Sequence, residues 1–118
     1  MELRLDQESY RPGEALTGVF QVDGEPPEEY RLELSVLWHT EGKGDEDLRV
    51  ILFQEWSSEK KPLDFEQPQS FSVRLPRTPL SYDGQLIKIL WLVRVRMRWI
   101  PYGEMLTETP FLLESPRR

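Results

Sequence analysis

Few residues in this chain could carry out chemistry, and they are far apart. The sequence has no cysteine and a single histidine, His39, so it offers no Cys–His pair of nucleophile and base. His39 ends an alternating segment on the side that we assign to solvent, and we expect it to be a surface or hydrogen-bonded side chain. The carboxylates are scattered over predicted turns rather than paired for acid–base work. The sequence therefore predicts a protein that is not an enzyme and has no catalytic residues and no cofactor.

One acidic run deserves separate treatment as a cation site. Asp45, Glu46 and Asp47 follow two glycines in the segment 42–47. The segment lacks the spacing of an EF-hand loop and the lysine and helix of a phosphate-binding loop. Glycines that adopt positive φ favour a solvated hairpin loop instead, so we assign no metal site. Binding of calcium here, or of a small ligand in a pocket near Tyr82, is kept as the alternative function.

The charge of the chain is unevenly distributed. Its formal net charge is −6, yet residues 1–73 hold 7 basic and 17 acidic side chains and residues 74–118 hold 8 and 4. Nucleic-acid affinity depends on a basic field, so the acidic half argues against nucleic acid as a partner. Arg94, Arg96 and Arg98 form a local basic stripe. We expect them to pair with glutamates of the acidic half across an antiparallel sheet.

The segments that carry these side chains are predicted to be β-strands. In 87–99 every odd position is apolar, whereas the even positions are, in order, Lys88, Leu90, Leu92, Arg94, Arg96 and Arg98. Successive strand residues point to opposite faces, so this pattern predicts a strand with one wholly apolar face. Further strands are predicted at 2–6, 15–22, 30–40, 48–56, 69–75 and 104–113, with a tight turn at 81–84.

This regular spacing of strands and turns predicts a single all-β domain over residues 1–118. We expect an antiparallel β-sandwich of about seven strands, very little helix, and a core centred on Trp38, Phe71, Trp91 and Val93. The last three residues, 116–118, should fray. The longest apolar run, 89–93, is far shorter than the roughly 20 residues of a membrane helix. With no signal pattern and no cysteine, we expect a cytoplasmic protein.

The second face of the predicted strands carries apolar residues where polar ones are expected. These residues are Leu37, Ile51, Phe53, Leu90 and Leu92. Two interpretations stay open: burial within the domain, by a bend of the long strand or by the segment 57–68, and an interface with another protein or a second copy. Together with Arg94, Arg96 and Arg98, which could orient an acidic partner, they are the predicted partner-binding residues of a non-catalytic scaffold or adaptor.

Two motifs add a family resemblance. The first is Tyr10-x-Pro12-Gly13-Glu14-x-x-x-Gly18, and the second is Phe71-x-Val73-x-Leu75-Pro76, then Pro79-x-Ser81-Tyr82-Asp83-Gly84, then the strand 87–98. In this order they resemble one β-sandwich domain of the arrestin-like fold, which occurs in arrestins and in bacterial sporulation-control relatives. The resemblance implies an immunoglobulin-like sandwich and a role as an interaction scaffold. It does not imply receptor binding, because the paired lysines that read a phosphorylated receptor and the acidic adaptor-binding tail have no counterpart.

Overall fold

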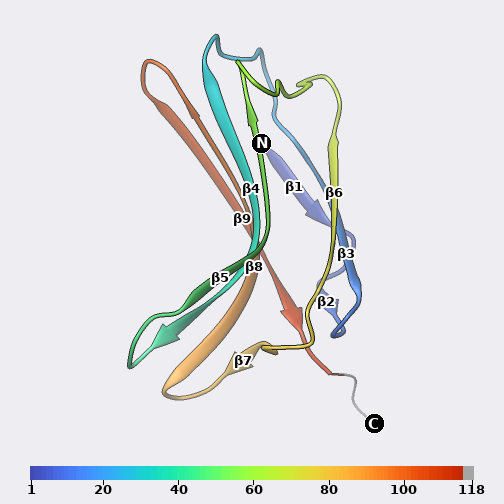
Figure 1. Cartoon of the computed structure of the whole chain (residues 1–118), viewed down its shortest axis with the longest axis vertical. Helices are drawn as coiled ribbons and strands as arrows, with labels where there is room; N and C mark the ends of the chain where they lie inside the picture. Colours follow the sequence, from blue (N-terminus) through green and yellow to red (C-terminus); the bar gives the residue numbers. More distant parts are fainter. Residues whose placement is uncertain (116–118) are drawn as a thin grey trace.

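The computed structural model describes residues 1–115 and shows two β-sheets packed face to face (Figure 1). The smaller sheet has the order β1 (Glu2–Leu5), β3 (Ala15–Gln21), β6 (Gln69–Arg74). The larger has the order β2 (Ser9–Tyr10), β9 (Gly103–Leu113), β8 (Ile87–Trp99), β4 (Tyr30–Gly42), β5 (Leu48–Ser57), and β7 (Tyr82–Asp83) also pairs with β8. Neighbours are antiparallel except β2 and β9. The predicted all-β sandwich is confirmed.

Residues 1–115 form more strands than the seven that were predicted. All seven predicted segments are present within residues 1–115, and the two-residue strands β2 and β7 are additional. The prediction of a tight turn at 81–84 was wrong in detail, because Tyr82 and Asp83 pair with Ile89 and Lys88 and the chain reverses beyond them. The predicted fraying of 116–118 lies outside the described residues.

The core lies between the sheets and follows the predicted alternation. Trp91, Val93, Val95 and Met97 of β8 are buried there together with alternate residues of β3, β4 and β6. The indole Nε1 of Trp91 donates a 2.8 Å hydrogen bond to the carbonyl oxygen of Pro79, which satisfies the polar edge of a buried ring. Trp38, predicted at the centre, is only half-buried at the margin. It is the cross-strand partner of Trp91.

The smaller sheet is packed tightly at one glycine. Gly18 of β3 pairs with Leu5 of β1 and Phe71 of β6. A Cβ atom built on Gly18 would lie 2.6 Å from Cζ of Phe71 and 2.7 Å from the carbonyl oxygen of Arg4. The absence of a side chain therefore lets the Phe71 ring cross over β3.

A hydrogen bond joins the turn after β1 to β2. The Tyr10 hydroxyl donates to Oδ1 of Asp6, and the Asp6 N–H donates to the carbonyl oxygen of Thr17 at 3.1 Å. Burial alone would raise the pKa of Asp6, but hydrogen bonds from the side chains of Tyr10 and Thr17 outweigh burial and lower it. Burial and the bond to Asp6 raise the pKa of Tyr10 well above its ordinary value.

β5 contains a β-bulge that changes which residues face the core. Val36 of β4 pairs with Leu52, but the next residue, Leu37, pairs with Val50, so Ile51 is an extra residue. Ile51 and Leu52 both pack against the core. The assignment of Ile51 to the second face was therefore wrong, because a bulge inverts the alternation of every residue that precedes it. Leu48 and Val50, which strict alternation with Ile51 would place on the core face, are exposed instead.

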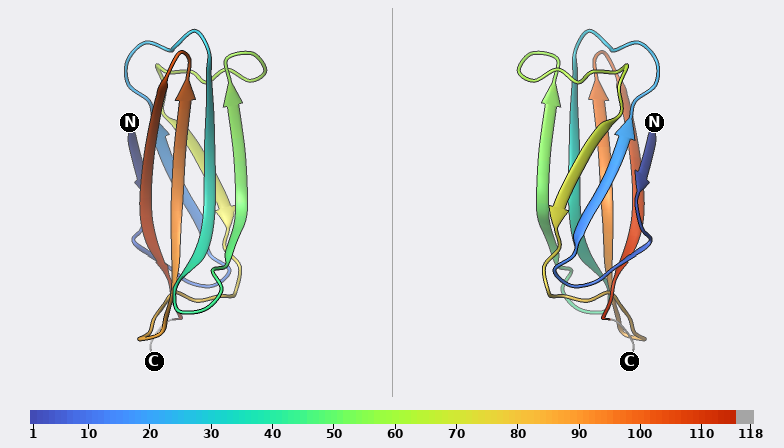
Figure 2. Two further views of the ribbon diagram at one scale, coloured as in Figure 1. Left: turned by 90° about the vertical axis from the view of Figure 1, so that its left-hand side faces the viewer. Right: turned by 90° about the vertical axis from the view of Figure 1, so that its right-hand side faces the viewer.

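The larger sheet is strongly bent, and its outer side is hollow. The strands curve away from the smaller sheet at both ends, so the solvent-facing side of β9, β8, β4 and β5 forms a concave face (Figures 1 and 2). The bulge lies in mid-sheet, and bulges increase local twist and bending. The β8–β9 hairpin and the β4–β5 and β7–β8 hairpins project from the two ends of this face (Figure 1).

Candidate functional site

The lower half of the concave face is apolar. In one row across the sheet, Val50, Leu37, Leu92 and Pro110 are successive partners on β5, β4, β8 and β9. Leu37 is 1% exposed and Leu92 is 8% exposed, although neither belongs to the core between the sheets. We call the following set the apolar half: Leu37, Leu48, Val50, Phe53, Leu90, Leu92, Pro110 and Leu112. Here the bend gathers side chains into a second apolar cluster, and no other element of residues 1–115 packs over it.

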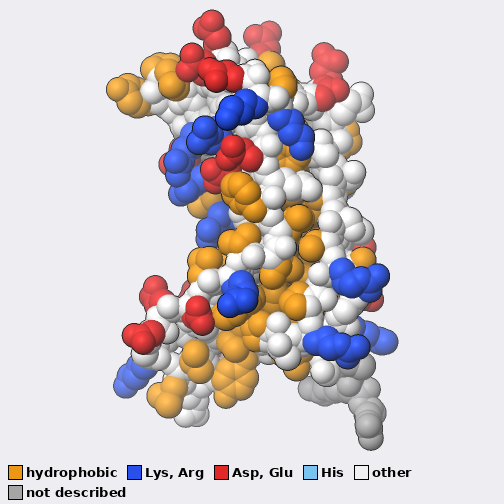
Figure 3. Space-filling view, viewed as in Figure 1, with side chains coloured by type: hydrophobic (Ala, Val, Ile, Leu, Met, Phe, Trp, Pro, Cys, Tyr) orange, Lys and Arg blue, Asp and Glu red, His pale blue; other side chains and the backbone are white. Residues whose placement is uncertain are grey.

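The rim of the apolar half is open to solvent. Leu48, Val50, Phe53 and Leu112 are between 44% and 55% exposed. The segment 57–68 does not cover them, since its Leu63 and Phe65 pack into or against the core. In the space-filling view, orange side chains spread over the middle and lower part of the molecule, beside the hollow on its left (Figure 3). Leu37 and Leu92 are thus buried by neighbouring side chains of the concave face itself. The side chains at the rim are not covered by any other described part of the chain.

The upper half of the concave face is charged but balanced. Nε of Arg94 donates a 2.7 Å hydrogen bond to Oε2 of Glu108, and Nε of Arg96 lies 2.8 Å from Oε1 of Glu104. The second contact is an ion pair without hydrogen-bond geometry, because the buried Nε of Arg96 has no acceptor among the described residues. Arg98 lies 4.0 Å from the same Glu104 oxygen. As predicted, Arg96 lies opposite a glutamate of the acidic half, Glu33 of β4. The carboxylates that contact Arg94 and Arg96 lie instead on β9.

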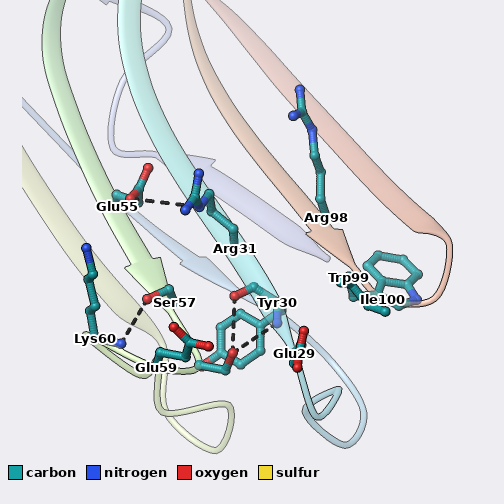
Figure 4. A pocket seen from close by; sticks show the side chains of 11 residues that line it. Glu29, Tyr30, Arg31, Glu55, Ser57, Glu59, Lys60, Arg98, Trp99 and Ile100 are labelled. Carbon is teal, nitrogen blue, oxygen red and sulfur yellow. Dashed lines mark hydrogen bonds and ion pairs between the residues drawn. The ribbon is translucent and has the colours of Figure 1, made fainter.

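A small hollow of about 280 Å³ lies at the top of this charged half (Figure 4). Arg31 and Arg98 are direct cross-strand partners there, and Arg31 approaches Glu55 at 4.0 Å. Like charges opposite each other repel. Among the described residues, each of these two guanidinium groups has one carboxylate within ion-pair distance, at 4.0 Å. These two arginines are therefore the cations of the face that are most available to a carboxylate from outside.

A larger groove of about 620 Å³ lies where β9 leaves β8 and β7 replaces it. Leu90, Pro110 and Leu112 of the apolar half line it, together with Tyr82. Three carboxylate residues complete its lining: Glu8, Asp83 and Glu114. The groove agrees with the expectation of a pocket near Tyr82, and its lining combines apolar surface with negative charge.

The acidic loop forms a hairpin connection. The Asp47 N–H donates to Oγ1 of Thr40 at 2.8 Å, and Oδ1 of Asp47 accepts from the Leu48 N–H at 3.0 Å. Within residues 1–115, no group of three or more His, Cys, Asp or Glu side chains is arranged to hold a metal ion. The same part of the chain has no helix that is long and apolar enough to cross a membrane.

The concave face brings together seven of the eight predicted residues. Leu37, Phe53, Leu90 and Leu92 lie in its apolar half, and the three arginines lie in the charged half. Ile51 is the exception. Sequence reasoning missed Pro110 and Leu112, which the two-residue period of β9 could have revealed. It also missed Leu48 and Val50, because nothing in the sequence marks the bulge.

Comparison with known proteins identifies the fold. No family model matches the chain, and no curated protein matches it in sequence. Its structure matches that of Spo0M, a sporulation control protein from Bacillus subtilis, with a TM-score of 0.64 and 14% sequence identity over 98% of this chain. The match covers 49% of Spo0M, so the chain spans about half the length of that protein. The arrestin-like fold is confirmed.

Proposed function

We propose that this arrestin-like domain is a non-catalytic protein-binding module, a small cytoplasmic scaffold or adaptor, whose concave face binds an apolar segment of another protein. The observation that carries the proposal is the uncovered apolar half, where two fully packed leucines are ringed by half-exposed apolar side chains. Contiguous exposed apolar patches mark partner surfaces in soluble proteins. The likeness to a sporulation control protein, at 14% identity, is compatible with a regulatory or interaction role.

The charged half would orient the partner rather than attract it. Arg94 and Arg96 already contact carboxylates at 2.7 and 2.8 Å, so a partner carboxylate would have to displace Glu108 or Glu104. Arg98 and Arg31, at 4.0 Å from their carboxylates, can accept a new acidic neighbour without this loss. The partner segment would accordingly place apolar residues over the lower half and an acidic residue near Arg31 and Arg98.

Affinity capture with two matched variants tests this proposal. Leu112→Glu puts a charge on the rim of the apolar half, and Val19→Glu puts the same charge on a 39%-exposed residue of the smaller sheet. A protein retained by the wild type should be identified, purified and titrated against all three forms. We expect Leu112→Glu to weaken binding at least tenfold and Val19→Glu to leave it unchanged. Equal binding by both variants would refute the assignment to the concave face.

The groove beside Tyr82 supports a second candidate function, the binding of a small apolar cation. Its volume lies within the range of ligand sites, and its three carboxylates favour a positive head group. A ligand specific to the native state raises the melting temperature by mass action. Phenethylamine should therefore raise the melting temperature, and phenylacetate, the matched anion, should not. The same response to both molecules would argue against this function.

A further inference from the structure

β5 forms a free edge of the larger sheet. Within residues 1–115 its backbone pairs with β4 on one side, and on the other only Ser57 is engaged, through two hydrogen bonds exchanged with Lys61. All residues from Leu48 to Phe53 except Ile51 and Leu52 are exposed. The strand is ten residues long and contains no proline, one of the residues that protect an edge from pairing. This edge can therefore accept a further strand.

The backbone groups that point outward can be deduced from the two ends of β5. The Thr40 N–H donates to the carbonyl oxygen of Asp47, so Asp47 faces β4 and, by alternation, Leu48 and Val50 face outward. Ser57 faces outward because it bonds to Lys61, so Glu55 and Phe53 face outward as well. Within residues 1–115, Val50, Phe53 and Glu55 thus present unpaired N–H and C=O groups, with an irregular step at the bulge between Val50 and Phe53. Leu48 presents its C=O group, while its N–H donates to Oδ1 of Asp47.

The irregular step at the bulge restricts which strands can form a regular ladder with β5. A regular strand that matched Leu48 and Val50 would be out of phase with Phe53 and Glu55. A second β5 running antiparallel carries the same step at the same place. Val50 of one copy then faces Phe53 of the other, and Leu48 faces Glu55, with outward groups opposite outward groups throughout. Val50 and Phe53 are 44% and 54% exposed, so each pair would bury apolar surface that solvent now covers.

Charge at the two ends of β5 favours the same arrangement. Asp45, Glu46 and Asp47 precede the strand with one cation, Lys43, and Lys60 and Lys61 follow it with one anion, Glu59, all of them exposed. The acidic side chains are thus in excess before β5 and the basic ones after it. Figure 4 shows the Lys60 side chain beside the end of β5, on the side away from β4. A two-fold axis through the centre of β5 places the acidic loop of each copy next to the lysines of the other. This attraction opposes the repulsion between two chains of net charge −6.

We propose that two copies of this chain associate through antiparallel pairing of their β5 edges, with Val50 of one copy opposite Phe53 of the other. The two larger sheets then form one continuous sheet, and the two concave faces become neighbours. The contact uses the backbone edge and the side chains of Val50 and Phe53, which belong to the rim of the apolar half. It does not require that the face also binds another protein.

Disulfide trapping tests the register directly, because the chain has no cysteine of its own. Val50→Cys and Phe53→Cys proteins are purified separately, mixed in equal amounts and oxidised with glutathione disulfide. Opposed residues lie within disulfide reach, whereas Val50 of the two copies would be separated by three residues, roughly 10 Å. We expect the mixture to give a covalent dimer in several-fold higher yield than either variant alone, or than Leu48→Cys mixed with Phe53→Cys.

Light scattering over a concentration series gives the second, independent readout. The wild type should shift from monomer to dimer mass, Glu46→Lys should weaken the dimer, and Glu46→Lys/Lys60→Glu should restore it. All of these residues are exposed, so the variants are expected to fold. A monomer at every concentration, or crosslinking that does not depend on cysteine position, would overturn the proposal. A dimer that is insensitive to both charge variants and gives no Val50–Phe53 crosslink would overturn it as well.

Discussion

Replacing Leu37 by alanine should destabilise the fold although this residue faces away from the core between the sheets. Its side chain is 1% exposed, so the substitution removes almost the whole of a buried leucine. Buried Leu→Ala changes cost about 2–5 kcal/mol, the lower values occurring where the surroundings can relax into the space. The concave face is open above Leu37, so its rim can relax, and we expect a loss of about 2–3 kcal/mol.

Leu106→Ala is the matched control for this prediction. Leu106 lies on the same face, opposite Arg96, and is 49% exposed. Burying a whole leucine side chain contributes roughly 1.5–3 kcal/mol, so half-burial contributes about 0.8–1.5 kcal/mol. The two variants remove the same atoms, and their difference isolates the burial that the bend gives to Leu37.

Urea unfolding followed by tryptophan fluorescence measures both changes. With a slope of about 1–3 kcal/mol per molar for a small domain, Leu37→Ala should lower the midpoint by about 1 M or more. Leu106→Ala should lower it by half of that amount or less, with unchanged slopes in both variants. If the two midpoints coincide, Leu37 is not buried by its neighbours on the concave face and the second apolar cluster does not exist.

Three further predictions concern the interior and pH. Gly18→Ala should lower the free energy of unfolding by about 1–3 kcal/mol, because the new Cβ atom would overlap an aromatic ring and a backbone oxygen. The melting temperature should therefore fall by several degrees, and an unchanged melting temperature would refute the tight packing. Trp91→Phe should cost about 1–3 kcal/mol in chemical unfolding, since it leaves a carbonyl oxygen without its donor. The pKa of Asp6 is lowered on folding, so the contribution of Asp6 to stability is present above about pH 4 and is lost as the pH falls. In a plot of unfolding free energy against pH, Asp6→Asn should therefore reduce the slope on the acid side.

Much of the fold could be predicted because the strands alternate strictly. The periodicity of β8 placed Trp91 and Val93 in the core without any structural information. Turn residues between the strands located most of their ends. The same reasoning failed at Trp38, because a period of two shows which face a residue is on and not whether another layer covers that face.

The candidate site was predicted only in part because the bulge leaves no mark in the sequence. Ile51 and Leu52 both turn inward, and a strict alternation cannot represent two successive residues on one side. Leu37 and Phe53 were placed correctly because they lie on segments where the alternation is unbroken. The expected glutamate of the acidic half lies opposite only Arg96, as Glu33. The carboxylates of β9 that contact the arginines were missed, since pairing between strands depends on topology, which the sequence pattern does not contain.

The pairing of β4 with β8 has a consequence for how the chain folds. Its register runs from Gly42 opposite Ile87 to Tyr30 opposite Trp99, so even the closest partners are far apart in sequence. The hairpins β4–β5 and β8–β9 are local and can form within microseconds, whereas joining them requires closure of the long intervening chain. Until that step is complete, both hairpins expose an apolar face and two unpaired edges. The slow step in folding is therefore also the stage at which newly made chains are most exposed to aggregation.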